Sequence, residues 1–148
     1  MSRRKEYTTT YQVSLQEMED MRDWNYRVQN AVYNEMPESV IDGLLADIMY
    51  IANFFIKNPA YTAATVIVDL INYLLEEEKQ LLMNALSTGA AELDELINFC
   101  EGKDWQLIEF EAAVLEFTDR GFCCIQGGVQ FKRYMKDGVW FGSGGPSK

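Results

Sequence analysis

The sequence predicts one α+β domain that is mainly helical, with about five helices and a small C-terminal antiparallel β meander, to which an N-terminal strand could add. Apolar residues recur at three- and four-residue steps through most of residues 15–101, as they do on helices. After Gly121, short β-rich segments alternate with turn residues. The 148 residues, 48% of them hydrophobic and 24% charged, suffice for one core. We therefore assign 1–141 to a single domain and 142–148 to a flexible tail.

The first elements are a strand and a capped helix. Tyr7–Val13 is rich in Thr and Tyr, which favour strands. Ser14 and Glu17 have the spacing of a capping box, in which each side chain accepts a hydrogen bond from the other residue's backbone N–H at the start of a helix. We therefore expect a helix over Leu15–Glu35, with its apolar residues on one face.

Two strongly apolar helices form the expected core. The second helix should span Pro37–Lys57, because a proline costs nothing in the first turn and Asn58-Pro59 ends the segment. The third should begin near Ala60 and run on to Leu86, before Thr88-Gly89 interrupts the pattern. Each has only a narrow polar stripe, which indicates neighbours on more than one side.

The segments that follow are shorter. Ala90–Glu101 predicts a fourth helix, closed by Gly102. Trp105–Arg120 is ambiguous, because its apolar residues alternate as in a strand while its polar residues also fit a helical face. We predict a fifth helix there, capped by Asp104. Beyond it, Gly127-Gly128 and Asp137-Gly138 are hairpin signals between strands.

Charge is distributed unevenly along the chain. Residues 14–119 carry 21 acidic and 5 basic side chains, whereas residues 1–13 have a net charge of +2 and residues 120–148 a net charge of +4, within a total of −10. The helical part is therefore acidic and the β part basic. A solvated helical surface alone explains such a bias, but an acidic face is also what a basic protein partner would recognise.

Three dense acidic groups mark the candidate partner-binding face, and we interpret the chain as a non-catalytic protein-binding protein. An inhibitor, an immunity-like protein or an anti-defence factor is the type of small protein that fits. The candidate residues lie on the first, third and fourth predicted helices: Glu17, Glu19, Asp20, Asp23, Glu76, Glu77, Glu78, Glu92, Asp94 and Glu95.

The alternative is a small single-stranded nucleic-acid-binding protein that uses the basic, aromatic C-terminal hairpin. Its candidate residues are Phe131, Lys132, Arg133, Tyr134, Lys136 and Trp140. Strand alternation weakens this interpretation, because it would place Phe131 with Arg133 on one face and Lys132 with Tyr134 on the other. The acidic remainder of the chain would also repel phosphate, so we regard a nucleic-acid partner as the less favoured one.

Several chemistries are excluded or unsupported. The chain has no histidine, so Ser-His-Asp and Cys-His machinery cannot form. Phosphate-binding glycine loops, EF-hands and zinc spacings are also missing from the sequence. A carboxylate-only enzyme remains open, with Glu92 and Glu95, or Glu109 and Glu116, as pairs on one helical face. We predict no enzyme activity, no cofactor and no metal.

Compartment and partners follow from the same composition. Cys100, Cys123 and Cys124 are an odd number without a plausible pairing, and we expect Cys123-Cys124 to be buried in a strand in a reducing, cytoplasmic setting. No uncharged stretch reaches the ~20 residues needed to cross a bilayer, so no membrane partner is expected. A homo-oligomer is possible.

Overall fold

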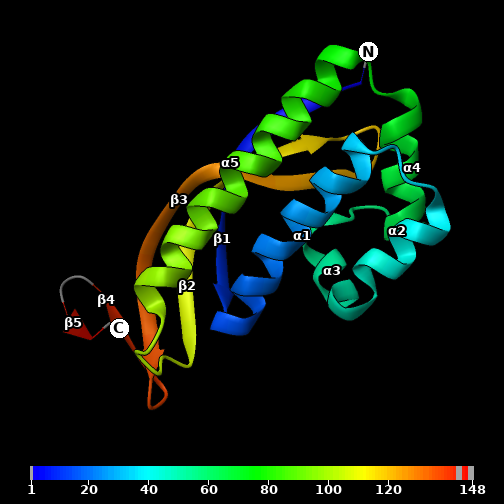
Figure 1. Cartoon of the computed structure of the whole chain (residues 1–148). Helices are drawn as coiled ribbons and strands as arrows, with labels where there is room; N and C mark the ends of the chain where they lie inside the picture. Colours follow the sequence, from blue (N-terminus) through cyan, green and yellow to red (C-terminus); the bar gives the residue numbers. More distant parts are fainter. Residues whose placement is uncertain (1, 143–144, 147–148) are drawn as a thin grey trace.

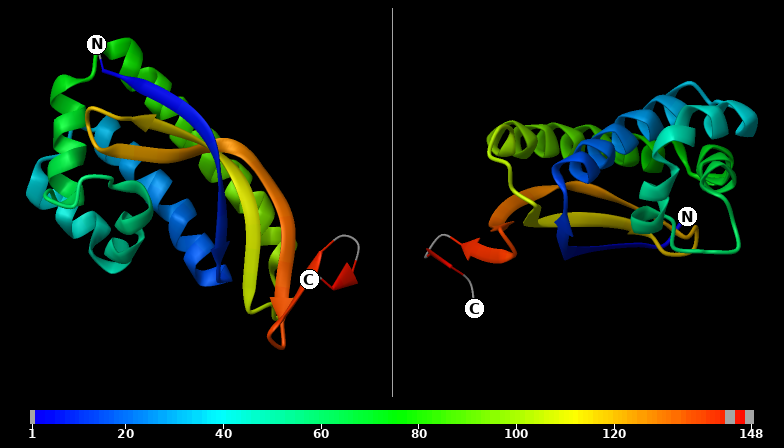
Figure 2. Two further views of the ribbon diagram at one scale, coloured as in Figure 1. Left: turned by 180° about the vertical axis from the view of Figure 1, so that it is seen from behind. Right: turned by 90° about the horizontal axis from the view of Figure 1, so that it is seen from below.

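The computed structural model describes residues 2–142 and 145–146 and consists of two layers, with helices covering the concave face of one curled sheet (Figures 1 and 2). The sheet is entirely antiparallel, with strand order β1-β2-β3-β4-β5. Its strands are β1 (Arg4–Val13), β2 (Leu107–Phe117), β3 (Phe122–Lys136), β4 (Val139–Gly142) and β5 (Gly145–Pro146). The predicted α+β class, rich in helix, is confirmed. The N-terminal strand that the sequence allowed does join the sheet, since β1 pairs with β2 along its whole length. The sheet is larger than the predicted C-terminal meander because residues 107–117 also form a strand.

β1 leads directly into α1 (Leu15–Tyr33), as the capping box predicts. The Ser14 hydroxyl accepts a hydrogen bond from the Glu17 N–H at 3.1 Å, and the Glu17 carboxylate accepts one from the Ser14 N–H at 2.9 Å. α1 buries the apolar face that the sequence indicates, with Trp24 fully enclosed and stacked on Phe55 at 6.0 Å between ring centroids.

The second helical segment is kinked. It comprises α2 (Glu38–Leu45), the 3-10 helix η1 (Ala46–Ile51) and α3 (Ala52–Phe55), and the backbone of Ile48 departs from helical geometry with φ −121°. Counted with α1, α4 and α5, this gives four helical segments among the described residues. The expectation of about five helices is therefore wrong, because the fifth was assigned to a segment that forms a strand.

The next helices divide at a different place from the predicted one. α4 (Ala63–Tyr73) ends at Leu74, whose backbone is extended, and α5 (Glu76–Cys100) continues without interruption through Gly89. Gly89 serves close packing instead of ending a helix. A Cβ at this position would lie 2.0 Å from the Ile125 carbonyl oxygen of β3, so only glycine lets α5 approach the sheet this closely.

The segment predicted as the fifth helix is β2, the strand between β1 and β3. The strand alternative, which we weighed against the helix from the sequence, is the correct one. The alternating apolar residues face the helices and are fully buried: Ile108, Phe110, Ala112 and Val114. Pairing on both sides outweighed the helix propensity of Ala and Glu. Asp104 does not cap a helix and has a positive φ of 56° ahead of the strand.

β3 is one bent strand of 15 residues where the sequence indicated two. Gly127-Gly128 does not form the predicted hairpin turn. It lies opposite Ala113, where the register between β2 and β3 shifts and Gly128 has a φ of +58°. The predicted Asp137-Gly138 turn is confirmed, since both residues have positive φ and join β3 to β4. Of the predicted tail 142–148, Gly142, Gly145 and Pro146 belong to strands, and the other residues lie outside those described.

Candidate functional site

Two long helices carry most of the predicted acidic residues. α1 and α5 pack side by side in opposite directions (Figure 1). The Arg22 guanidinium of α1 contacts the Asp94 carboxylate of α5 at 2.6 Å. Further along both helices, Gln29 Nε2 of α1 donates a hydrogen bond to the Met83 carbonyl oxygen of α5 at 3.4 Å. This arrangement brings Glu19 and Asp23 toward the C-terminal part of α5, where Asp94 and Glu95 lie.

Six of the ten predicted acidic residues have partners inside the molecule. Glu17 caps α1. Glu78 is 1% exposed and accepts hydrogen bonds from the Leu75 and Ser2 N–H groups at 2.9 and 3.0 Å. The remaining four likewise bind neighbouring groups: Asp20 accepts from the Tyr50 hydroxyl, Asp23 and Asp94 pair with Arg22, and Glu92 accepts from the Val129 N–H. The acidic clusters seen in the sequence are thus partly structural.

The other four predicted acidic residues lie in two places on the α1–α5 pair. Glu76 and Glu77 are exposed at the start of α5, and Glu76 lines a groove beside Tyr33, whose side chain is 74% exposed. Glu19 on α1 is half-buried and Glu95 on α5 is exposed, near the opposite end of the pair. Glu95 therefore remains available to a partner, next to the end of the helix.

An aromatic surface lies on the sheet beyond the end of α5. Trp105 stacks on Tyr134 at 4.1 Å and on Phe131 at 5.6 Å between ring centroids. Phe99, 51% exposed, contacts Phe131 edge-on at 5.4 Å, and Phe141 of β4 stacks on Tyr134 at 5.3 Å. We call these five rings the aromatic surface: Phe99, Trp105, Phe131, Tyr134 and Phe141. The Lys103 ammonium lies 5.1 Å from the Phe99 ring.

A bulge in β3 sorts the aromatic and basic residues onto opposite faces. Glu109 pairs with Arg133 and Phe110 with Phe131, so Lys132 is an extra residue in the ladder. The bulge turns Phe131 and Tyr134 to the same face, and the expectation from simple alternation is therefore wrong. Arg133 and Lys132 instead reach the outer face.

The basic residues of β3 are engaged by acidic residues of β2. Arg133 Nη2 lies 3.0 Å from Glu109 Oε1, and Lys132 Nζ lies 3.3 Å from Glu111 Oε1. Arg133 also stacks over the ring of Trp140 at 4.6 Å. The hydrogen bond from Arg133 is the main cause that lowers the pKa of Glu109. The side chains of Arg133 and Glu109 are 26% and 14% exposed. These cations are thus neutralised and separated from the aromatic surface. Lys136 is exposed at the β3–β4 turn.

The acidic and aromatic sets meet in one groove of about 290 Å³, which we call the α5–β3 groove. It is lined by Glu92, Glu95, Leu96 and Phe99 of α5 and by Val129 and Phe131 of β3. Glu92 is held toward the strand by the Val129 N–H at 3.0 Å. The sequence named Glu92, Glu95 and Phe131 for two different sites, and the fold brings them together.

Sequence reasoning missed two members of the aromatic surface, Trp105 and Phe99, as site residues. Trp105 was placed at the start of a helix that does not exist, and Phe99 was read as part of an ordinary amphipathic helix. A strand over residues 107–117 would have placed Trp105 beside Tyr134, so the alternating pattern of β2 held the missing signal.

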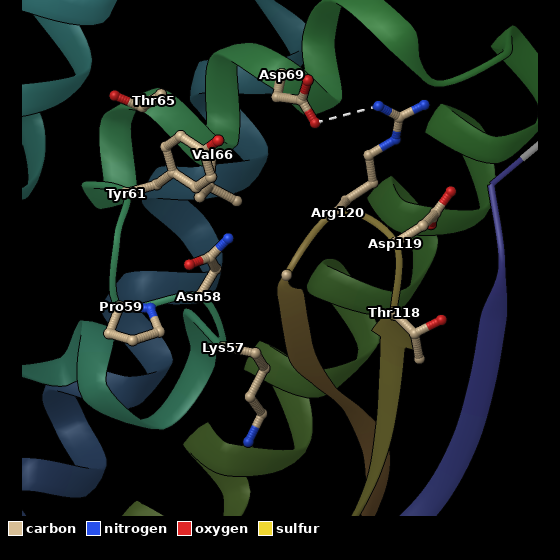
Figure 3. Close-up of a pocket in the computed structure, with 11 residues that line it drawn as sticks. Lys57, Asn58, Pro59, Tyr61, Thr65, Val66, Asp69, Thr118, Asp119 and Arg120 are labelled. Carbon is tan, nitrogen blue, oxygen red and sulfur yellow. Dashed lines mark hydrogen bonds and ion pairs between the residues drawn. The ribbon is translucent and has the colours of Figure 1, made fainter.

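A separate polar pocket of about 490 Å³ lies between α4, the loop before it and the β2–β3 turn (Figure 3). Arg120 spans it to contact Asp69 at 3.4 Å and also stacks over the Tyr73 ring at 5.2 Å. Asp119 accepts a hydrogen bond from the Arg3 N–H at 3.0 Å. Its two carboxylates thus have structural partners, and the pocket presents no pair arranged for acid–base chemistry.

The groups with shifted pKa values are explained by burial and structural pairing. Burial raises the pKa of the Cys100 and Cys123 thiols to about 11 and raises that of Cys124 further. Burial and the hydrogen bond to Asp20 raise the pKa of Tyr50 to about 12. Cys123 and Cys124 are buried in β3 as predicted. None of these groups has the lowered pKa that activates a nucleophile.

One of the two carboxylate pairs named for an enzyme is placed differently from the prediction. Glu109 and Glu116 lie near opposite ends of a strand, not on one helical face, with partners Arg133 and Tyr7 respectively. Glu92 and Glu95 do share α5. Within the described part of the chain, no group of three or more Cys, Asp or Glu side chains is arranged to hold a metal ion. Likewise, no described helix is long and apolar enough to cross a membrane.

Comparison with known proteins gave no match. No protein-family model, no curated protein and no solved structure resembles the chain at a significant level.

Proposed function

We propose that the chain is a non-catalytic protein-binding protein that holds a basic segment of its partner in the α5–β3 groove. The observation that carries this proposal is the meeting of Glu92 and Glu95 with the exposed Phe99 ring and the half-buried Phe131 ring in one groove. Aromatic side chains at a surface supply large buried areas and dominate interface energies. Carboxylates beside them select a partner that presents Lys or Arg next to apolar residues.

Charge supports a basic partner. The net charge of −10 would speed the encounter with a positively charged protein, and the effect weakens as salt rises. The surface formed by α1 and α5 carries further acidic residues. Glu19 lies at the same end of the helix pair as Glu95, and Glu76 and Glu77 lie at the other end. An inhibitor, an immunity-like protein or an anti-defence factor is the class of small acidic protein that this surface suits.

The experiment is a capture of partners from source-cell lysate with matched variants as bait. Wild-type protein should retain a basic protein at ~0.1 M salt and less of it at ~0.5 M, because exposed charges are screened over about 10 Å or less at these concentrations. Glu95→Gln and Phe99→Ser should each reduce the retained amount. Asp42→Asn, which removes the same charge from an exposed site on α2, is the control and should retain it fully. Equal retention by all four proteins would refute the groove as the binding site.

Single-stranded nucleic acid is the second candidate, favoured by one observation. The bulge places Phe131 and Tyr134 on the same face, where bases could stack. Against it, Lys132 and Arg133 are paired with Glu111 and Glu109 on the other face. Retention of nucleic acid that is lost in Lys132→Ala/Arg133→Ala would favour this candidate over the first.

A further inference from the structure

The two long edges of the sheet differ in whether the rest of the molecule hydrogen-bonds to their backbone. Along β3, the Val129 N–H donates to Glu92 and the Ile125 carbonyl accepts from Asn25 Nδ2 at 2.9 Å. At the start of β3, Ile56 forms a bridge to Phe122. Side chains and a neighbouring segment thus satisfy this edge, which is how proteins prevent unwanted strand pairing.

The opposite edge, β1, has no such cover. Among the described residues, only β2 hydrogen-bonds to the backbone of Arg4–Val13, in ten consecutive pairs without a bulge. The alternate N–H and C=O groups of an edge strand point away from the sheet. Tyr7–Val13 contains neither proline nor a charged residue. This part of β1 therefore lacks the proline, the charged side chain and the bulge that commonly block an edge, and the charged residues of the strand are confined to its start, Arg4–Glu6.

The outer side of β1 opens on a groove of about 280 Å³. Residues 7 and 9–12 of β1 line one side of it, and Asn53 and Phe54 of α3, Lys57, and Cys123 of β3 line the rest. Tyr11 packs edge-on against Phe54 at 5.9 Å, which leaves the groove between the strand and the helix. The edge is thus open where its sequence is uncharged.

We infer that β1 pairs with β1 of a second copy of this chain, antiparallel and centred on Thr9, so that two sheets join. The segment is self-complementary in this register. Tyr7 lies opposite Tyr11 of the second copy, and Thr8 lies opposite Thr10, which are aromatic and Thr–Thr cross-strand pairs that stabilise sheets. This pairing is independent of the α5–β3 groove, because β1 is at the other edge of the sheet.

Charge at the ends of the strand favours the same arrangement. Arg4 and Lys5 extend beyond the central pairs toward the position where the second copy begins its α1. The first turn of α1 carries Glu17. In the symmetric dimer, Arg4 and Lys5 of each copy therefore lie toward Glu17 of the other copy. No like charges lie opposite each other in the strand pair.

The experiment is sedimentation equilibrium of the full chain from micromolar to millimolar concentration. The wild-type chain should form a dimer. Thr8→Lys/Thr10→Lys places lysine opposite lysine at both pairs, so we expect the dimer dissociation constant to rise by about tenfold or more. Both threonines are exposed, and an unchanged circular dichroism spectrum shows that the variant folds. A wild-type chain that stays monomeric over the range overturns the inference.

A matched variant tests the register itself. Thr8→Lys/Thr10→Glu places lysine opposite glutamate at both pairs, so its dimer should be at least as strong as the wild-type dimer. If this variant dissociates as readily as Thr8→Lys/Thr10→Lys, the β1 register is wrong. If neither variant weakens the dimer, the interface lies elsewhere.

Discussion

At the scale of single residues, Gly89 shows how one backbone position sets the distance between the layers. α5 crosses β3 at this residue, beside the buried Asn25 side chain, which donates to the carbonyls of Leu86 and Ile125. A larger residue must push the helix away from the strand. The glycine that the sequence suggests as a helix end is thus a packing contact in the middle of a helix.

Gly89→Ala should lower the free energy of unfolding by at least about 1–3 kcal/mol, because overpacking in a rigid interior forces the backbone to shift. Gly43→Ala is the matched control. Gly43 lies in α2 with no atom within 4 Å of an added Cβ, so alanine should raise stability by about 0.5–1 kcal/mol through helix propensity. Urea denaturation of the three proteins measures both effects. Equal stability of Gly89→Ala and wild type would contradict the close approach.

The three thiols should be unreactive in the folded protein. Burial raises the pKa of Cys100 and Cys123 to about 11, so little thiolate exists near pH 8 and reagents cannot reach it. Iodoacetamide treatment followed by intact-mass measurement should show no alkylation of the native chain and three alkylations in urea. Rapid modification of one thiol in the native state would show that the core at β3 opens.

At the scale of elements, β2 organises the sheet, and its ion pairs fix the bulge in β3. Glu109 accepts hydrogen bonds from Arg133 at 3.0 Å and Gln12 Nε2 at 2.6 Å, which joins three strands. The Glu109–Arg133 pair is more enclosed than the Glu111–Lys132 pair, whose side chains are 38% and 39% exposed. The first pair therefore contributes more to stability than the second.

Glu109→Gln should reduce the free energy of unfolding by roughly 1 kcal/mol at pH 7. The pKa of Glu109 is lowered in the folded state, so its contribution is complete above the unfolded pKa of about 4.3 and is lost as the pH falls through the folded value. Chemical denaturation from pH 7 to pH 2.5 should show the two proteins converge in acid. Glu111→Gln is the control and should cost less. A difference that persists in acid would mean that packing, not charge, is lost.

The same elements show how far the sequence alone leads. Capping and apolar spacing located α1, and Thr and Tyr located β1, because these signals are local. β2 was assigned to a helix because its strand character depends on pairing with β1 and β3, which are far away in sequence. The sequence also placed Phe131 and Tyr134 on opposite faces for the same reason, since a bulge at Lys132 decides which way they face.

At the scale of the whole molecule, charge and aromatic area are separated by the two layers. Most acidic residues lie in the helical layer. The end of β3 extends past the end of α5 (Figure 2), and the aromatic surface lies there. Most acidic residues named from the sequence have structural partners. The sequence therefore predicted more partner-binding acidic residues than the fold leaves available. The α5–β3 groove is where solvent-facing acid and aromatic rings coincide.

The most direct test of the proposed function is a footprint of the captured partner on this chain by backbone amide hydrogen exchange. Binding in the α5–β3 groove should slow exchange in residues 92–105 and 129–136 and leave residues 38–55 unchanged. Glu95→Gln should weaken binding without moving the footprint. Protection confined to residues 38–55, with none in the C-terminal part of α5 or in β3, would contradict the proposal.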